Sequence, residues 1–171
     1  MAALSSLRSR RFSERQAETL RQYVAFRLRA AWFVLPVTTI DRVLPLESKA
    51  IPQITFEGKS IRLIDVGRLL FGKDPVKPAV PLILRGSPVS SQPSLLIVRD
   101  LNGAMASLPC NSQPALLRLA PTKFIVLPPT LAQRWHSGSL TGLVTGMAPS
   151  TSERPALFEI DPDRFVSIAS S

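Results

Sequence analysis

Apolar residues recur at every second position in the first strongly patterned stretch of the chain. Val24, Phe26 and Leu28 alternate with a mixed set of neighbours. A period of two is typical of a strand with one buried face, so a half-buried strand is predicted here. A turn is expected at residues 29–31, and a returning strand at residues 32–37.

The next stretch changes period, and short strand signals follow it. Ile40, Val43 and Leu44 have the spacing of a helical turn within residues 38–46. Gly58, in the segment 57–60, indicates a hairpin turn, and Asp100–Gly103 indicates another. Strands are predicted at residues 54–56, 61–64, 81–84, 94–98 and 104–110.

The chain contains a degenerate internal repeat. The pattern Ile-Asp-x-x-Arg-apolar occurs at Ile64–Leu69 and again at Ile160–Phe165, at an offset of 96 in the numbering. Earlier, Leu35–Leu46 aligns with Leu108–Leu119 at an offset of 73, and apolar residues coincide at 43/116, 44/117 and 46/119. Because 96 exceeds 73 by 23, the second copy is expected to carry about 23 extra residues between positions 120 and 155.

The repeat predicts an architecture. Each copy is expected to hold about five short strands, and a sheet of that size avoids open edges best by curling into a barrel. We therefore expect two small barrels side by side with a groove between them. Asp65 and Asp161 each stand where a strand gives way to a turn. A carboxylate at that point accepts backbone N–H groups as a helix N-cap.

Charge is concentrated near the N-terminus. The net charge of the 171-residue chain is +9, and the first thirty residues hold seven arginines against two glutamates, or +5 of that total. We expect a basic arm at residues 1–20, one domain with two barrel subdomains at 21–168, and a tail at 169–171. No apolar run approaches the ~18–20 residues that span a bilayer. No apolar signal core precedes the domain either, so a cytoplasmic protein is expected.

Residues suited to catalysis or metal binding are scarce. Cys110 is the single cysteine and His136 the single histidine, whereas zinc usually takes four Cys, His or carboxylate ligands. Cys110 is interpreted as a small apolar residue in a strand. Asp161 and Asp163 are interpreted as cap and turn residues, and no glycines cluster into a phosphate-binding loop. We expect a binding module, with no catalytic residue, cofactor or metal, rather than an enzyme.

Several of these segments, in this order, resemble the CheW family of bacterial chemotaxis coupling proteins. The resemblance rests on residues 23–28, 33–37 and 40–44 and on the pattern Gly-x-x-Ile-x-Leu-Ile-Asp-Val-x-x-Leu-Leu-x-Gly from Gly58 to Gly72. It is good over residues 22–72 and weaker but co-linear to about residue 168. It implies a mainly β fold of two intertwined five-stranded SH3-like β-barrels with short helices.

The resemblance also implies a role in two-component signal transduction. CheW-like proteins are scaffolds without enzymatic activity. They connect the cytoplasmic tip of methyl-accepting chemoreceptors to the regulatory domain of a CheA-type histidine kinase. The receptor's helical hairpin lies in the groove between the barrels. Membrane insertion and nucleic-acid binding are not implied, although recruitment to membrane-associated receptor arrays is.

Position by position, the resemblance assigns candidate contacts with receptor or kinase in the first barrel. Ile40 matches an apolar position on the receptor side of the groove. Arg42 stands where the family usually has an acidic residue. Glu57 stands where the family has the arginine of an Asn-Leu-Arg-Gly motif, which here reads Thr-Phe-Glu-Gly and ends at Gly58. Independently of the resemblance, Arg62 is a candidate for steering acidic partners, together with Arg27 and Arg29 on predicted strands; simple outward alternation of these arginines is the open alternative.

In the second barrel the candidates depart from the family pattern. Ser107 replaces a usual glycine, Asn111 a usual aspartate, and Gln113 an apolar groove residue. These departures suggest a divergent branch, such as one serving a type IV pilus or phototaxis system. The simultaneous charge inversion at Arg42 and Glu57 motivates the hypothesis that they form an ion pair, with charged atoms within ~4 Å.

A second function class stays open at this point. Small β-barrels with basic arms bind single-stranded nucleic acid, using aromatic side chains as stacking platforms. Tyr23 and Trp32 on adjacent strands would serve if both faced outward. Steep salt dependence of binding would distinguish this alternative from an adaptor.

Overall fold

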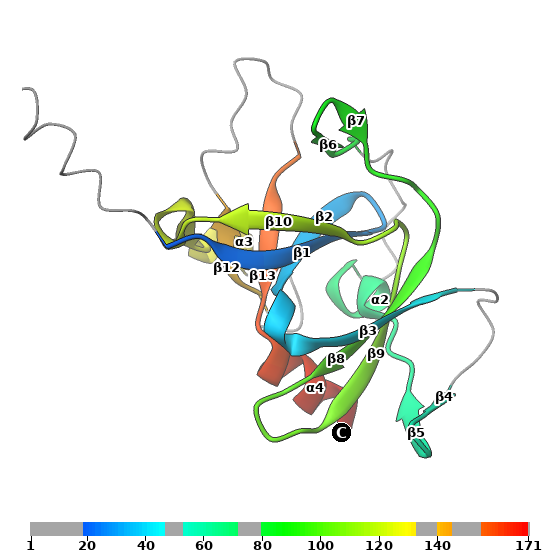
Figure 1. Cartoon of the computed structure of the whole chain (residues 1–171). Coiled ribbons are helices and arrows are strands. Elements are labelled where there is room, and N and C mark those ends of the chain that lie inside the picture. The colour runs from blue at the N-terminus through cyan, green and yellow to red at the C-terminus, as the bar shows by residue number, and fades with distance from the viewer. Residues whose placement is uncertain (1–18, 47–52, 72–79, 133–139, 145–154, 171) are drawn as a thin grey trace, which may run out of the picture.

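The computed structural model describes residues 19–46, 53–71, 80–132, 140–144 and 155–170, and its elements are mainly strands (Figure 1). The strands are β1 (Arg21–Leu28), β2 (Ala31–Pro36), β3 (Ile40–Pro45), β4 (Gln53–Phe56), β5 (Lys59–Arg62), β6 (Ile83–Leu84), β7 (Ser87–Pro88), β8 (Ser94–Arg99), β9 (Met105–Cys110), β10 (Ala115–Leu119), β11 (Phe124–Val126), β12 (Leu140–Val144) and β13 (Leu157–Ile160). The helices are α2 (Val66–Phe71), α3 (Pro129–Ala132) and α4 (Pro162–Ser170), with short 3-10 turns η1 (Val37–Thr39) and η2 (Pro121–Lys123). Most of the predicted arm and His136 lie outside the described residues.

Two copies of one strand unit are woven into each other. In the first unit, residues 21–71, β3 leaves the β1–β2 hairpin and pairs with β8 of the second unit. In the second unit, residues 94–170, β10 leaves the β8–β9 hairpin and pairs back with β1. Each unit thus extends the sheet of the other, which is the intertwined arrangement that we predicted.

The strand registers agree between the two units. Leu44 of β3 pairs with Leu95 of β8, and Leu117 of β10 pairs with Tyr23 of β1. Leu44 and Leu117 are related by the repeat offset of 73, whereas the offset between Tyr23 and Leu95 is 72. The repeat is therefore preserved in hydrogen-bond register, with a change of one residue between the first and second strands of the unit.

That one residue lies in a hairpin turn. Two residues separate the paired Leu28 and Ala31 in the first unit. Three separate Asp100 and Ala104 in the second, where the Asp100 N–H donates to the Ala104 carbonyl at 3.0 Å. Gly103 adopts a φ of +83°, a conformation that favours glycine. The turn signal predicted from the sequence is thus confirmed.

A parallel pairing repeats at the end of each unit. Leu63 bridges in parallel to Ser107 of β9, and Glu159 of β13 pairs in parallel with Val34 of β2. The offset of 96 relates Leu63 to Glu159, and the offset of 73 relates Val34 to Ser107, so the two pairs are equivalent. In both units the chain then enters a helix, α2 or α4.

Side-chain contacts join strands that are not hydrogen-bonded neighbours in each half of the molecule. One sheet has the order β10-β1-β2-β13-β12-β11, yet the rings of Tyr23 on β1 and Phe124 on β11 lie 4.8 Å apart. The three-stranded sheet has the order β3-β8-β9, and the Arg42 guanidinium of β3 lies 5.3 Å from the ring centroid of Phe56 on β4, which belongs to the separate β4-β5 sheet. Side-chain contacts, rather than ladders among the described residues, bring these two barrel-like subdomains toward closure.

Three apolar clusters fill the molecule, one inside each barrel and one between them. The barrel-1 cluster contains Phe56, Ile61, Leu95 and Ile97. The barrel-2 cluster contains Tyr23, Ala25, Trp32, Val34, Leu82, Leu117, Leu119, Val144 and Leu157. The inter-barrel core includes Phe26, Leu28, Phe33, Leu35, Leu96, Val98 and Leu108.

The position of β1 between two clusters corrects the sequence-based expectation of a half-buried strand. Phe26 and Leu28 face the inter-barrel core, while Tyr23 and Ala25 face the barrel-2 cluster. Both faces of the strand are therefore covered. The alternation identified the strand, but the second covering layer comes from segments far away in the sequence.

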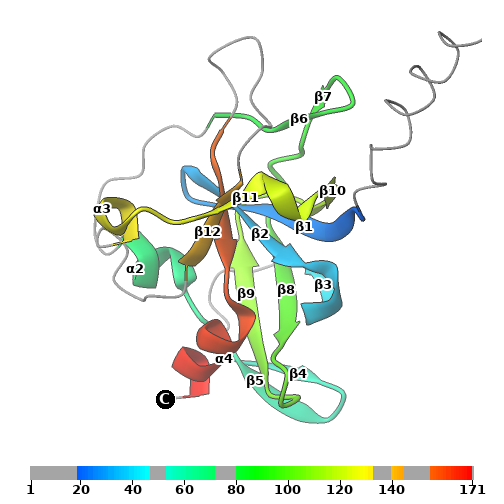
Figure 2. The ribbon, with the colours of Figure 1, turned by 90° about the vertical axis from the view of Figure 1, so that its left-hand side faces the viewer.

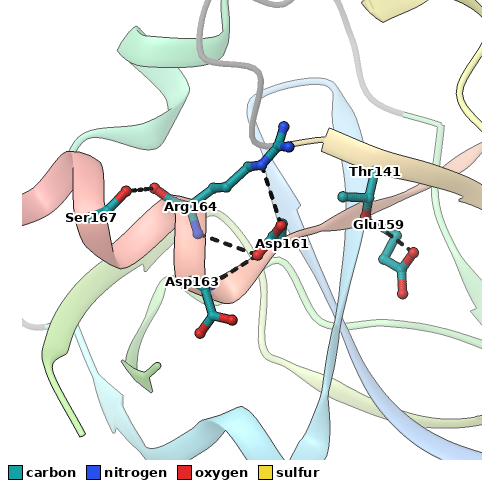
Figure 3. A network of polar contacts seen from close by, with 6 residues as sticks. All are labelled: Thr141, Glu159, Asp161, Asp163, Arg164 and Ser167. Carbon is teal, nitrogen blue, oxygen red and sulfur yellow. Dashed lines mark hydrogen bonds and ion pairs between the residues drawn. The ribbon is translucent and has the colours of Figure 1, made fainter. Parts of the chain in front are cut away.

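Aspartates cap both helices that end the units, as predicted. The Asp65 carboxylate accepts the Arg68 N–H at 2.8 Å. The Asp161 carboxylate accepts the N–H groups of Asp163 and Arg164 at 3.0 and 3.2 Å, and Arg164 also forms an ion pair with it (Figure 3). The repeated Ile-Asp pattern thus marks a helix start in each unit.

Two local predictions were wrong. Ile40–Leu44 is not a helical turn but part of strand β3. An irregularity in the β3–β8 register between Ile40 and Arg42 places Ile40 and Val43 opposite Val98 and Leu96, so residues three apart share one face and imitate helical spacing.

The strand predicted at residues 81–84 is shorter than expected. Only Ile83–Leu84 is a strand, paired with Ser87–Pro88 across a turn in which Gly86 has a φ of +81°. Pro81 precedes this hairpin and Pro88 is the last residue of β7, and proline cannot donate a ladder hydrogen bond.

Candidate functional site

Two equivalent strand positions expose apolar side chains. Val43 on β3 is 45% exposed, and its repeat counterpart on β10, Leu116, is 56% exposed. Their neighbours Leu44 and Leu117 pack into the two barrel clusters instead. The pattern is therefore repeated in both units, one residue turned inward to its barrel and the preceding one left accessible.

Strand pairing fixes the direction in which these two side chains point. Directly opposed residues in an antiparallel pair project to the same face. Val43 is opposite Leu96, a member of the inter-barrel core, and Leu116 is opposite Val24 on the corresponding face of β1. We call the side of the strands on which Val24, Ile40, Val43, Leu96 and Leu116 lie the inter-barrel face. Val24 and Leu96 are buried on it, Ile40 is half-buried, and Val43 and Leu116 are exposed. β3 lies below β1 and β10 on one side of the molecule (Figures 1 and 2).

Ile40 belongs to this face and Arg42 does not. Ile40 is half-buried and packs against the inter-barrel core. Arg42 is exposed, and its guanidinium lies over the Phe56 ring of barrel 1. A cation over an aromatic face contributes roughly 0.5–1 kcal/mol at exposed sites. Arg42 thus helps to hold β3 against β4.

Glu57 and Gly58 form the tip of the β4–β5 hairpin. Both are exposed and have positive φ angles, +50° and +73°. Arg99–Asp41 and Arg164–Asp161 are ion pairs among the described residues, whereas no ion pair joins Arg42 to Glu57, so the predicted pair is not formed in this structure. The cation–π contact with Phe56 takes its place.

Of the remaining candidates, Arg62 and Ser107 are in contact, and Gln113 lies at a different strand. Arg62 is exposed at the end of β5, and its carbonyl accepts the Ser107 hydroxyl at 2.9 Å. Ser107 itself is fully buried, with 0% exposure, so its side chain supports the β5–β9 junction and lies out of reach of a partner. Gln113 is exposed just before β10, where its N–H donates to the Ser90 carbonyl. The seven candidates therefore do not form one patch.

Asn111, the other departure in the second barrel, holds the β1–β2 turn. Its side-chain oxygen accepts the Arg29 N–H at 2.7 Å, and its own N–H donates to the Arg27 carbonyl at 2.7 Å. Arg29 needs this support because its φ is +53°. The amide therefore has a structural role at this position.

Cys110 is the buried strand residue that was predicted. Its thiol contacts the carbonyls of Ser94 and Ser112, and burial raises its pKa to about 11. A thiol held protonated is a poor nucleophile. It lines a cavity of about 330 Å³ together with Arg29, Asp65 and Asn111. Within the described residues, no group of three or more His, Cys, Asp or Glu side chains could hold a metal ion.

The aromatic platform that nucleic-acid binding requires is not present on β1 and β2. Tyr23 and Trp32 are both buried in barrel 2, and the Trp32 indole N–H donates to the Val80 carbonyl at 2.8 Å. Neither ring can stack on a base. The observation that supported the nucleic-acid alternative is therefore overturned.

Sequence reasoning missed a polar cluster at barrel 2 (Figure 3). Glu159 is half-buried, accepts a hydrogen bond from the Thr141 hydroxyl at 3.2 Å, and stands where the first unit has Leu63. Burial raises its pKa above the usual value, and Asp161 adds to the effect. The offset of 96 could have revealed this charge, because it aligns a glutamate with a leucine.

Comparison with known proteins identifies the fold. No protein-family model and no curated protein matches the chain. No helix of the described residues is long and apolar enough to cross a membrane. The crystal structure of the scaffolding protein TtCheW from Thermoanaerobacter tengcongensis is similar, with a TM-score of 0.56 and 17% identity over 83% of this chain and 89% of that one. The chain therefore has a mainly β, CheW-like fold.

Proposed function

We propose that this protein is a non-enzymatic chemosensory adaptor, which links the cytoplasmic tip of a chemoreceptor to the regulatory domain of a CheA-type histidine kinase. The proposal starts from the fold, which resembles that of a protein named as a scaffold. It also draws on the resemblance of residues 22–72 to coupling proteins. Such an adaptor works in the cytoplasm, recruited to membrane-associated receptor arrays.

The observation that carries the proposal is the exposure of Val43 and Leu116 on the inter-barrel face. Scattered exposed apolar residues are ordinary, but an equivalent pair from two units on one face supports a docking function. A helix can lay one apolar face into such a surface, because its residues at i, i+3, i+4 and i+7 lie along one stripe. The helical hairpin of a receptor tip supplies that stripe.

The kinase contact is assigned to the tips and edges of the barrels. Glu57 and Gly58 project at the end of a hairpin, and Gln113 is exposed before the edge strand β10. Arg42 and Glu57 each carry the opposite charge to the residue that the family usually has at that position. This supports a partner whose contacting charges are reversed in the same way. We therefore propose a divergent pathway, such as one controlling a type IV pilus or phototaxis.

The test measures binding of the purified chain to two partners from the same organism, a receptor-tip hairpin and a CheA-type regulatory domain. The double substitution Val43→Asp and Leu116→Asp should weaken binding of the receptor hairpin at least tenfold, about 1.4 kcal/mol, because it places two charges on the apolar face. Binding of the regulatory domain should change little. Isothermal titration calorimetry gives both affinities.

The matched control is Leu101→Asp. Leu101 is 88% exposed at the tip of the β8–β9 turn, so this substitution adds a charge away from the inter-barrel face. If the wild-type chain binds neither partner, or if Leu101→Asp weakens the receptor hairpin as much as the double variant does, the proposed function is wrong.

A further inference from the structure

A groove on the helical side of the molecule is separate from the inter-barrel face. It has a volume of about 520 Å³ and runs between the β5–α2 junction and α4. Figure 2 shows α2 and α4 on one side of the molecule and β3 and β10 on the other. A segment bound in this groove would therefore leave the inter-barrel face open.

The floor of the groove is apolar. Leu63, Leu69 and Ile168 are half-buried within it, and Ile64 is buried beneath them. Half-burial means that each side chain still presents apolar surface to solvent. Covering that surface is favourable in proportion to the apolar area that is removed from water.

The rim of the groove is basic. Arg62 and Arg68 are exposed and line it, against one carboxylate, Asp65. The Asp65 oxygen Oδ1 already accepts the Arg68 N–H, which reduces what it offers to a partner. Two guanidinium groups beside an apolar floor are complementary to a segment that carries acidic and apolar residues together.

The second unit shows that the groove is not required by the fold. By the offset of 96, the positions equivalent to Arg62 and Leu69 are Phe158 and Phe165. Phe165 is buried in the inter-barrel core and Phe158 packs against it. The same backbone plan thus encloses Phe165 in the core in one unit, whereas in the other unit Leu69 packs against that core and also lines a groove with a basic rim.

We infer that the α2–α4 groove is a second docking surface, which binds an acidic amphipathic helix of a partner protein. A helix is favoured because it presents its apolar side chains along one face, and that face can cover Leu63, Leu69 and Ile168 together. Acidic side chains flanking that stripe would meet Arg62 and Arg68. This inference does not depend on the proposed function, and a chain with two independent surfaces could hold two partners at once.

The test uses a synthetic amphipathic peptide on the order of 18 residues, or about 27 Å of helix. Its leucines lie at i, i+3, i+4 and i+7, and glutamate fills most other positions. Fluorescence anisotropy should show binding to the full chain, and amide NMR shifts should map to residues 62–69 and to Ile168. The same peptide with lysine in place of glutamate should bind at least tenfold more weakly.

Charge reversal locates the contact. Arg62→Glu with Arg68→Glu should weaken binding of the glutamate peptide at least tenfold. Ile168→Asp should also weaken binding, because it places a negative charge on the apolar floor of the groove. The matched control is Arg85→Glu with Arg118→Glu, which makes the same change in net charge at exposed sites outside the groove. This control should leave the affinity within about twofold, because distant charges are screened by salt.

Three results would overturn the inference. The first is failure of the glutamate peptide to bind, and the second is equal weakening by the control pair. The third is a single-stranded oligonucleotide that displaces the peptide and binds more tightly, since this would assign the arginines to phosphate. None of these outcomes involves Val43 or Leu116, so they are distinguishable from failure of the adaptor proposal.

Discussion

The first and second strand units follow the same path through space, yet they differ at the junction between the last strand and the helix. In the first unit Leu69 remains half-buried at a groove, whereas its counterpart Phe165 is enclosed in the inter-barrel core. The helices differ accordingly, since α2 has six residues and α4 has nine. The longer second helix brings Ile168 to the groove of the first unit.

The hairpin turns show a second contrast. The Arg29 side chain packs over α2, where a Cβ added at Gly67 would lie 3.3 Å from its Nε. In the second unit, the Asp163 carboxylate accepts the Leu101 N–H at 2.9 Å. Gly67 and Asp163 are equivalent by the offset of 96. The junction between hairpin turn and helix is therefore made differently in the two units. In the first, the Arg29 side chain lies against Gly67; in the second, the Asp163 carboxylate accepts the Leu101 N–H.

These contrasts show which part of the repeat is constrained. Strand register, parallel pairing and the capping aspartate are kept, because the intertwined strands depend on them. Side chains at the strand-to-helix junctions have changed in polarity and size. The shared plan therefore supports the fold, and the differences are where separate binding properties are expected.

The largest predicted difference between the units concerns Phe165 and Leu69. Phe165→Ala should destabilise the protein by about 3–5 kcal/mol, because it leaves a cavity in the inter-barrel core. Leu69→Ala should cost only about 1–2 kcal/mol, since that side chain is already half-exposed. Urea unfolding followed by circular dichroism measures both. If Phe165→Ala does not fold, Phe165→Leu provides the comparison, and equal costs at the two sites would contradict the contrast.

A smaller difference is predicted between the two caps. Asp161→Ala removes hydrogen bonds to two N–H groups and an ion pair, whereas Asp65→Ala removes one hydrogen bond among the contacts described above. Cap removal typically costs about 0.5–2 kcal/mol, so Asp161→Ala should lie near the upper end and Asp65→Ala near the lower. Thermal unfolding measures the order. Asparagine at either position is the control and should retain most of the stability, while a reversed order would contradict the prediction.

Local signals in the sequence predicted much of the fold. The Asp100–Gly103 turn, the strand pair 94–98 and 104–110, and both capping aspartates are confirmed. Each depends on a few adjacent residues whose conformational preferences are strong. The repeat predicted two barrels side by side, and the resemblance to the CheW family added that they are intertwined; the pairs β3–β8 and β1–β10 were not predicted from either.

The rest depended on which segments lie against each other. β3 was missed because a register irregularity gives Ile40 and Val43 a shared face at helical spacing. Burial of Tyr23 and Trp32 comes from the barrel-2 cluster, whose members are spread from Tyr23 to Leu157. The offset of 73 already aligned Val43 with Leu116 in the sequence. Their exposure, however, depends on which segments lie against β3 and β10, and no local sequence pattern records that.

Glu159 offers the finest test of the comparison, because the first unit has Leu63 at the same place. Burial raises the pKa of this carboxyl in the folded protein above its usual 4.5, so the folded state binds the proton more tightly than the unfolded state does. Stability should therefore be greatest at low pH, as far as this group is concerned, and fall as pH rises through the folded-state pKa. Glu159→Gln removes that titration while keeping an acceptor for the Thr141 hydroxyl.

The glutamine variant should match the wild type near pH 4 and become slightly more stable above it, by less than about 1 kcal/mol, because solvent screens a half-exposed carboxylate. Thermal unfolding of both proteins between pH 4 and 8 measures the gap. Leu63→Gln is the matched control, since it changes the equivalent position without removing a titrating group, and its effect should not vary with pH. If the wild type gains stability relative to Glu159→Gln as pH rises, Glu159 has a stabilising charged partner, and the contrast with Leu63 would be one of pairing rather than of desolvation.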